Sequence, residues 1–247
     1  MVARFVWLLA LCVGCAGSKQ ASSGTSLPGW VEDRDSVRYE LIEHFLDADD
    51  ASRALEVIRV MREELGEDAK LDMYQGEAFR KQGMLADSER LLIAARAKRP
   101  RDPKVHAQLC IVYADQRKMD EAVSACSRSV TLDESQPDVW NNVGFLYLGQ
   151  ERYPDAVDAL QRAVDLDGTV VRYRNNLAIA LVCSGMAERG LNMFLTMHSR
   201  ADANYNVGVA LERIGARDEA MRYYEAAVEY DAKHENALAA LASDSVD

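Results

Sequence analysis

Apolar residues recur along most of the chain at the spacing of amphipathic helices, and short polar turns separate one apolar pattern from the next. Between residues 137 and 170, Val143 and Tyr147 lie four positions apart on one face of a first helix. Ala156 and Leu160 have the same spacing on one face of a second helix. These patterns predict an all-α chain that is built from helical hairpins.

The helical hairpins repeat with a period of 34 residues. The aromatic residues Phe79, Tyr113 and Tyr147 are one period apart. Small residues keep the same spacing at another place of the unit: Gly76, Cys110 and Gly144. A two-helix unit of this length, with small and aromatic residues at fixed places, resembles the tetratricopeptide repeat.

The register of this repeat divides residues 35–234 into six units. The units are 35–68, 69–102, 103–136, 137–170, 171–200 and 201–234. The resemblance implies an all-α right-handed superhelical solenoid of six tetratricopeptide-like helix pairs. Residues 235–247 are expected to form a C-terminal capping helix over the exposed end of the stack.

The fifth unit, residues 171–200, is four residues shorter than the others, which is about one helical turn. Gly190 and Met197 also change the apolar face of its second helix. We therefore expect an altered stacking angle between the last units. Such a deletion is either a functional bend or a shortened loop, and the shortened loop is the more frequent outcome.

The first fourteen residues have the features of a secretory signal. Arg4 supplies a positive charge, Phe5 to Val13 is an unbroken apolar run, and small residues follow. The run is about half of the roughly 20 residues that a membrane-spanning helix needs. We therefore expect residues 1–14 to be a signal peptide that is removed.

The end of this signal, Leu-Cys-Val-Gly-Cys-Ala at residues 11–16, resembles the lipobox of bacterial lipoproteins, although Cys12 stands where that family prefers leucine. The resemblance implies lipidation of Cys15, and the alternative is a soluble secreted protein in which this cysteine is incidental. Residues 15–34 are then a lipidated flexible tether. Ala16 is not the aspartate that retains such proteins at the inner membrane. The expected location is therefore the periplasmic face of the outer membrane, provided that the host has two membranes.

The composition limits the classes of function that remain. Of the 247 residues, 49% are hydrophobic, which is enough to build a core. Forty acidic residues against 29 basic ones give a formal net charge of −11, and no run rich in Lys or Arg is present. Nucleic acid is therefore not an expected partner. The negative charge either keeps the repeat protein soluble or favours a basic partner.

Residues that could form a catalytic or metal site are scarce. The four histidines fall in separate units: His44, His106, His198 and His234. The chain has no glycine-rich phosphate loop, no nucleophile elbow and no paired-histidine motif. We expect no enzyme activity, no cofactor, no metal and no small-molecule substrate.

Cys110 and Cys126 fall on the two faces where the helices of the third unit meet. An oxidising periplasm would permit a disulfide between them, worth about 3 kcal/mol in the chain-entropy model. The alternative is two buried thiols at small core positions. Cys183 is expected to remain unpaired.

The resemblance also implies a partner-binding groove, because first helices line the concave surface in this repeat family. A carboxamide both donates and accepts hydrogen bonds, so a row of them can hold a peptide backbone. One such row is Gln108, Asn142, Asn176 and Asn206. Apolar residues at a neighbouring place are Ile111, Phe145, Ile179 and Val209, and other predicted groove residues are Asn141, Asn175, Tyr205 and Leu148. Asparagine is common at this place in such repeats, so its presence alone does not establish binding.

The first two units carry charged residues at the corresponding places, such as Glu43, Glu77 and Arg80. That end of the groove is expected to bind less. Six repeats after a lipobox resemble the pilotin lipoproteins of type IV pili, and residues 174–181 also resemble the repeat lipoproteins of the Tad pilus. The resemblance implies a non-catalytic periplasmic adaptor that binds an extended peptide or helix of a partner, with a secretin as the candidate. The alternative is a scaffold for peptidoglycan hydrolases or another envelope complex.

Overall fold

The computed structural model describes residues 33–244, and within that range thirteen helices and no strands form a stack of helical hairpins. The pairs are α1 (Asp33–Asp47) with α2 (Ala51–Leu65), α3 (Ala69–Lys81) with α4 (Leu85–Lys98), α5 (Pro103–Asp115) with α6 (Met119–Leu132), α7 (Pro137–Gly149) with α8 (Tyr153–Leu166), α9 (Val171–Cys183) with α10 (Ala187–Leu195), and α11 (Arg200–Arg213) with α12 (Arg217–Tyr230). A last helix, α13 (Glu235–Asp244), packs on α12. The predicted fold, a solenoid of six helix pairs with a capping helix, is confirmed.

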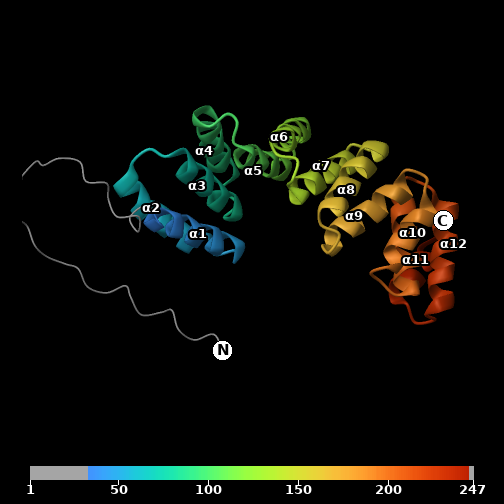
Figure 1. The fold of residues 1–247 in the computed structure, drawn as a ribbon. Coiled ribbons are helices and arrows are strands. Elements are labelled where there is room, and N and C mark those ends of the chain that lie inside the picture. The colour runs from blue at the N-terminus through green and yellow to red at the C-terminus, as the bar shows by residue number, and fades with distance from the viewer. Residues whose placement is uncertain (1–32, 245–247) are drawn as a thin grey trace, which may run out of the picture.

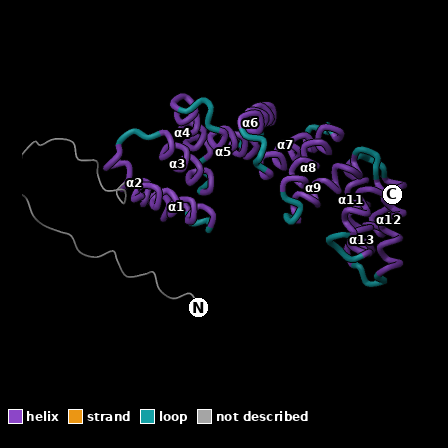
Figure 2. Tube along the Cα trace, viewed as in Figure 1, coloured by secondary structure: helices purple, strands orange, loops and turns teal. Residues whose placement is uncertain are grey.

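Figure 1 shows the pairs side by side along an arch, with the first pair at one end and the last pair at the other. Only short turns and loops join the helices (Figure 2). The predicted signal peptide (1–14), the lipidation site Cys15 and nearly all of the tether (15–34) lie outside the described residues, as do residues 245–247 of the predicted cap. Among the described helices, none has the length and apolar character that crossing a membrane requires.

Local sequence signals explain where the helices begin. The Asp68 carboxylate accepts hydrogen bonds at 2.8 Å from the backbone N–H groups of Lys70 and Leu71, which otherwise have no partner in the first turn of α3. Pro103 and Pro137 occupy the first turns of α5 and α7, where no helical hydrogen bond from the missing N–H is needed. These caps define hairpins of nearly constant length, so that successive pairs stack in register.

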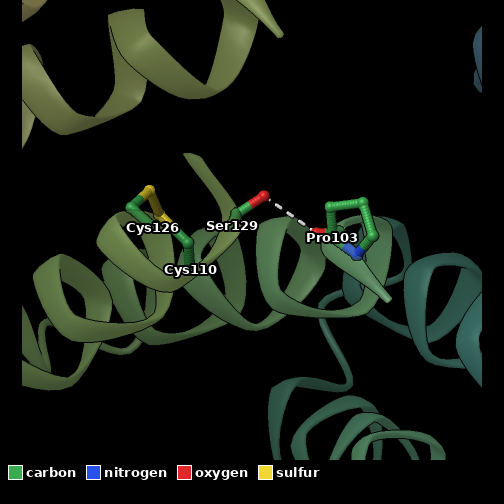
Figure 3. Close-up of a disulfide and its surroundings, with 4 residues drawn as sticks. All are labelled: Pro103, Cys110, Cys126 and Ser129. Atoms are coloured by element: carbon green, nitrogen blue, oxygen red, sulfur yellow. Dashed lines mark hydrogen bonds between the residues drawn. A yellow bond between two sulfur atoms is a disulfide. The ribbon is translucent and has the colours of Figure 1, made fainter. Parts of the chain in front are cut away.

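The two helices of a pair approach each other closely where a small residue of the first faces a large residue of the second. A Cβ atom at Gly76 would lie 2.8 Å from Cγ of Leu92, and Gly144 faces Leu160 in the same way. In the third pair a disulfide between Cys110 and Cys126 occupies this crossing, with 5.0 Å between the Cα atoms (Figure 3). The close approach that the second, fourth and sixth pairs reach with glycine is therefore achieved here with a covalent bond.

The fifth pair differs from the others in its second helix. Helix α10 has 9 residues, whereas α8 and α12 have 14 each. The connection after α10 (196–199) is as long as the one after α8 (167–170), so the deletion shortens the helix and the preference for a shortened loop is wrong. Across the shortened pair, the guanidinium of Arg213 on α11 donates to the Leu148 carbonyl on α7 at 3.1 Å. The sixth pair therefore contacts the fourth directly, and the altered stacking angle stays a prediction.

Candidate functional site: a groove over the first helices

A concave groove of about 790 Å³ runs over the first helices of the N-terminal pairs. Its walls come from α1, α3, α5 and α7, with one residue, Arg172, from α9 and one, Gln136, from the turn before α7. The largest apolar residues that line it are Leu46, Met73, Ile111, Val139, Phe145 and Leu146. The hollow is therefore a surface between several repeats, and no single pair could form it.

Four of the predicted groove residues line this hollow: Gln108, Ile111, Asn142 and Phe145. Phe145 is 58% exposed, which is unusual for a large aromatic side chain on a helix that packs on both sides. Gln108 donates from Nε2 to the Glu77 carboxylate at 2.8 Å, which joins α5 to α3 across the groove. An aromatic side chain and two carboxamides are thus presented together to an incoming chain.

Two predicted groove residues, Leu148 and Asn141, are buried instead, so those predictions are wrong. Leu148 packs with Leu177 and Leu181 of α9, because the neighbouring first helix covers its position. Asn141 is 3% exposed, and its Oδ1 accepts a hydrogen bond at 2.8 Å from Nδ2 of Asn176. This hydrogen bond joins α9 to α7, so the Asn176 amide takes part in the packing between these two helices.

The remaining predicted residues lie on α9 and α11, outside the hollow. Asn175 pairs with Nε2 of His198 at 2.9 Å, and Ile179 is half-buried against the apolar core. Tyr205 packs against the ring of Tyr224 at a centroid distance of 5.6 Å. The two others are Asn206 and Val209. The four carboxamides of the predicted row therefore do not line one continuous groove, because only Gln108 and Asn142 lie in the hollow.

Charged residues of the first two pairs form much of the groove wall, and the expectation that this end binds less stays a prediction. The Tyr74 hydroxyl donates to the Glu43 carboxylate, and this bond holds the pKa of Glu43 below its ordinary value. Lys104 on α5 pairs with the same carboxylate at 3.3 Å. The hollow therefore extends over the first two units as well as the third and fourth, which supply the predicted residues that line it.

Burial raises the pKa of the Glu77 carboxyl, and the charge of Asp47 adds to this effect although Arg80 and Lys81 oppose it. Two buried polar atoms beside it, Oε1 of Gln108 and Nε of Arg80, have no hydrogen-bond partner. The groove wall at α3 and α5 therefore holds polar groups whose bonding capacity is not used within the described chain.

Candidate catalytic groups do not converge in the described residues. His106 is buried, and its Nε2 lies 3.0 Å from the Pro100 carbonyl oxygen, which is a structural hydrogen bond. Cys110 is held in the disulfide, and Cys183 is buried and free. Within residues 33–244, no group of three or more His, Cys, Asp or Glu side chains is placed to hold a metal ion.

The fold is that of a tetratricopeptide-repeat solenoid. Tetratricopeptide-repeat family models match residues 73–137 and 201–234. Proteins with this repeat are generally protein–protein interaction adaptors. The chain matches no curated protein sequence at a significant level.

Solved structures share this fold at low sequence identity. PilF of Pseudomonas aeruginosa superposes with a TM-score of 0.65 at 16% identity, covering 87% of this chain and all of PilF. YrrB, a tetratricopeptide-repeat protein with an unusual peptide-binding site, has a TM-score of 0.61 at 22% identity, with 74% of this chain and 96% of YrrB covered. MamA has a TM-score of 0.56 at 24% identity, with 69% and 97% covered. At these identities the similarity establishes the fold alone.

Proposed function

We propose that this protein is a non-catalytic adaptor that holds a segment of a partner protein in the groove over α1, α3, α5 and α7. The observation that carries the proposal is the exposed ring of Phe145 in a hollow that also contains Gln108 and Asn142. An exposed aromatic anchor beside carboxamides is typical of surfaces that bind polypeptide. The peptide-binding site of YrrB, a protein of the same fold, supports this use of the fold.

A photo-reactive amino acid at position 142, inside the groove, tests the adaptor function in living cells. The matched control carries the same amino acid at Arg128, which is exposed on α6 away from the groove. We expect a cross-linked partner from position 142 and none from position 128. Equal products from both positions, or none from position 142, would contradict binding in the groove.

We further propose that the adaptor is anchored by lipid at Cys15 to the periplasmic face of the outer membrane, where it assists assembly of a secretin for a pilus. The lipobox-like sequence before Cys15 supports the anchor. The similarity to the pilus-related PilF over that protein's whole length supports the pilus role.

Deletion of the gene, followed by an unboiled gel for secretin multimers, tests the pilus role. We expect fewer multimers and fewer surface pili, and we expect Cys15→Ser to reproduce the defect with a protein that is still folded. Normal multimers and normal pili in the deletion strain would reject the secretin role and leave the adaptor role to the cross-linking result.

A further inference from the structure

Ion pairs between first helices neutralise most of the charge along the groove, but two carboxylates remain. The pairs are Lys104–Glu43 at 3.3 Å, Arg80–Asp115 at 3.3 Å and Arg172–Asp138 at 2.5 Å. Within residues 33–244, neither Asp47 nor Glu77 forms an ion pair, and both line the groove. The unmatched charge is therefore negative and lies where α1 and α3 contribute to the wall.

The surroundings of Glu77 favour an incoming cation. Removing a carboxylate from water is unfavourable, and burial raises the pKa of Glu77 even though the charges of Arg80 and Lys81 oppose the shift without forming an ion pair with it. Its one hydrogen bond comes from Gln108, whose other amide atom, Oε1, is buried without a partner. A Lys or Arg side chain would supply both a charge for Glu77 and donors for the unused oxygen.

The opposite end of the groove carries an exposed apolar side chain beside the paired Asp138 and Arg172. Phe145 on α7 is the most exposed large hydrophobic residue on any of the described helices, and Ile111 on α5 lies between it and the carboxylates in the order of the helices. A bulky apolar side chain of a partner would remove the Phe145 ring from water. The groove thus has unpaired carboxylates at one end and an exposed aromatic ring at the other.

The distance between the two ends of the groove suits an extended occupant. Helices α3 and α7 are two interaxial steps apart, about 16–20 Å at 8–10 Å each. An extended chain covers that distance in about five or six residues.

Building on the proposed function, we infer that the groove selects an extended partner segment with a Lys or Arg side chain that pairs with Glu77 and Asp47. A bulky apolar side chain about five or six residues away in the segment contacts Phe145 and Ile111. The charges of the groove are complementary to a basic segment, and an acidic segment would meet two unneutralised carboxylates.

Selection of random dodecapeptides displayed on phage, against the full-length protein in detergent, tests this inference. We expect the selected peptides to share a basic residue and a bulky apolar residue at the spacing given above. The consensus peptide should bind the Asp47→Asn/Glu77→Gln variant about tenfold more weakly or worse. The control variant Glu225→Gln/Glu229→Gln changes the same charge on α12, and it should bind as the wild type does.

A second peptide, in which Gln replaces the basic residue, completes a double-mutant cycle. This peptide should bind wild type and the Asp47→Asn/Glu77→Gln variant equally, because the charge pair is already absent. Thermal melting of each variant verifies that it is folded. Peptides that require Phe145 but lack a basic residue would overturn the inference and leave the adaptor role intact. Failure to select any peptide whose binding is lost in Phe145→Ser would reject both.

Discussion

The two halves of the solenoid use the same face of their first helices in different ways. In the N-terminal half, α1, α3, α5 and α7 leave a hollow that is lined by charged residues, carboxamides and Phe145. In the C-terminal half, the equivalent face of α9 carries Asn176, which is hydrogen-bonded to Asn141 of α7, and Asn175, which pairs with His198 in the connection after α10. A residue's place in the repeat unit decides which way its side chain points. The stacking of adjacent helix pairs decides whether that side chain stays accessible to a partner.

The shortened α10 marks the boundary between these halves. In the C-terminal half, α10 is short, α11 packs against α9, and Arg213 of α11 reaches the Leu148 carbonyl on α7. The N-terminal half has full-length second helices, and there the contact between alternate pairs is the ion pair of Lys104 on α5 with Glu43 on α1. The halves should therefore respond differently to substitutions that disturb packing, cross-linking or charge.

The largest effect is expected from Gly144→Val, which breaks the pair next to the boundary. Even a Cβ atom at this position would overlap with Leu160 and approach the Ala156 carbonyl oxygen at 3.1 Å. We expect the free energy of unfolding to fall by about 3 kcal/mol or more. Gly149→Ala is the control, because a Cβ there meets nothing within 4 Å. Urea unfolding measures both, and equal midpoints for the two variants would contradict the close crossing.

Loss of the disulfide should weaken the N-terminal half specifically. The bridge closes a sequence separation of 16 residues, so its loss is expected to reduce stability by about 3 kcal/mol in the chain-entropy model. The measurement is urea unfolding of wild type and Cys110→Ala/Cys126→Ala, each with and without a reducing agent. Of these two proteins, only the wild type should be destabilised by the reducing agent. A Cys183→Ala variant keeps the bridge, so it should respond to the reducing agent as the wild type does. An unchanged midpoint for the reduced wild type would argue against the bridge.

Changing one exposed apolar side chain in each half of the solenoid should show which half binds the partner. Phe145→Ser removes the exposed ring of the N-terminal groove, and we expect about tenfold weaker binding of a cross-linked partner or selected peptide. Val209→Ser is the matched change on α11, where Val209 is 43% exposed outside the hollow. Equal losses for the two variants would mean that binding is not confined to the N-terminal half.

The pH dependence of stability should separate two glutamates of the same groove. The pKa of Glu77 is raised by burial, so its carboxyl favours the folded state at low pH, and this contribution is lost as pH rises through the raised pKa. Glu43 behaves in the opposite way. Its pKa is lowered by the Tyr74 hydrogen bond, so its contribution is present above the ordinary pKa and is lost as pH falls through the lowered value.

Compared with wild type, Glu77→Gln should therefore be more stable at neutral pH than at acidic pH. Glu43→Gln should show the opposite, with its loss of stability relative to wild type larger at neutral pH. Urea unfolding at several values between pH 3 and pH 8 gives the measurement. A destabilised Glu77→Gln at pH 7 would show that the carboxylate already has a sufficient partner within the chain.

The smallest effect concerns the turns inside the pairs. Gly185 and Gly215 form these turns in the C-terminal half with positive φ, as Gly83 does in the second pair, whereas Arg117 and Glu151 take the same conformation in the third and fourth pairs at φ of 61° and 59°. Glu151→Gly should therefore stabilise the protein by about 1 kcal/mol, because glycine has no Cβ to strain in this conformation. Gly185→Ala should destabilise it by a similar amount in thermal unfolding. A loss of stability in Glu151→Gly would contradict this explanation of the turn.

Local signals made most of the fold predictable. The small residues at Gly76 and Gly144, the prolines at helix starts and the 34-residue spacing each depend on a few neighbouring residues, so the sequence alone placed the hairpins. The candidate site was predicted less well. The register correctly placed Gln108, Asn142, Ile111 and Phe145 on an open surface, but it also placed the buried Leu148 there. Burial of Leu148 depends on α9, a different element whose approach no local pattern encodes.

The sequence by itself determined the number of helix pairs, their order and the face of each first helix, because these follow from helical periodicity and from local capping and turn chemistry. Only the tertiary structure decided which of those faces form a groove, which cysteines are joined and which carboxylates lack a cation. These properties depend on distances between side chains from different repeats, such as Glu77 on α3 and Gln108 on α5, and such distances are set by how one pair stacks on the next.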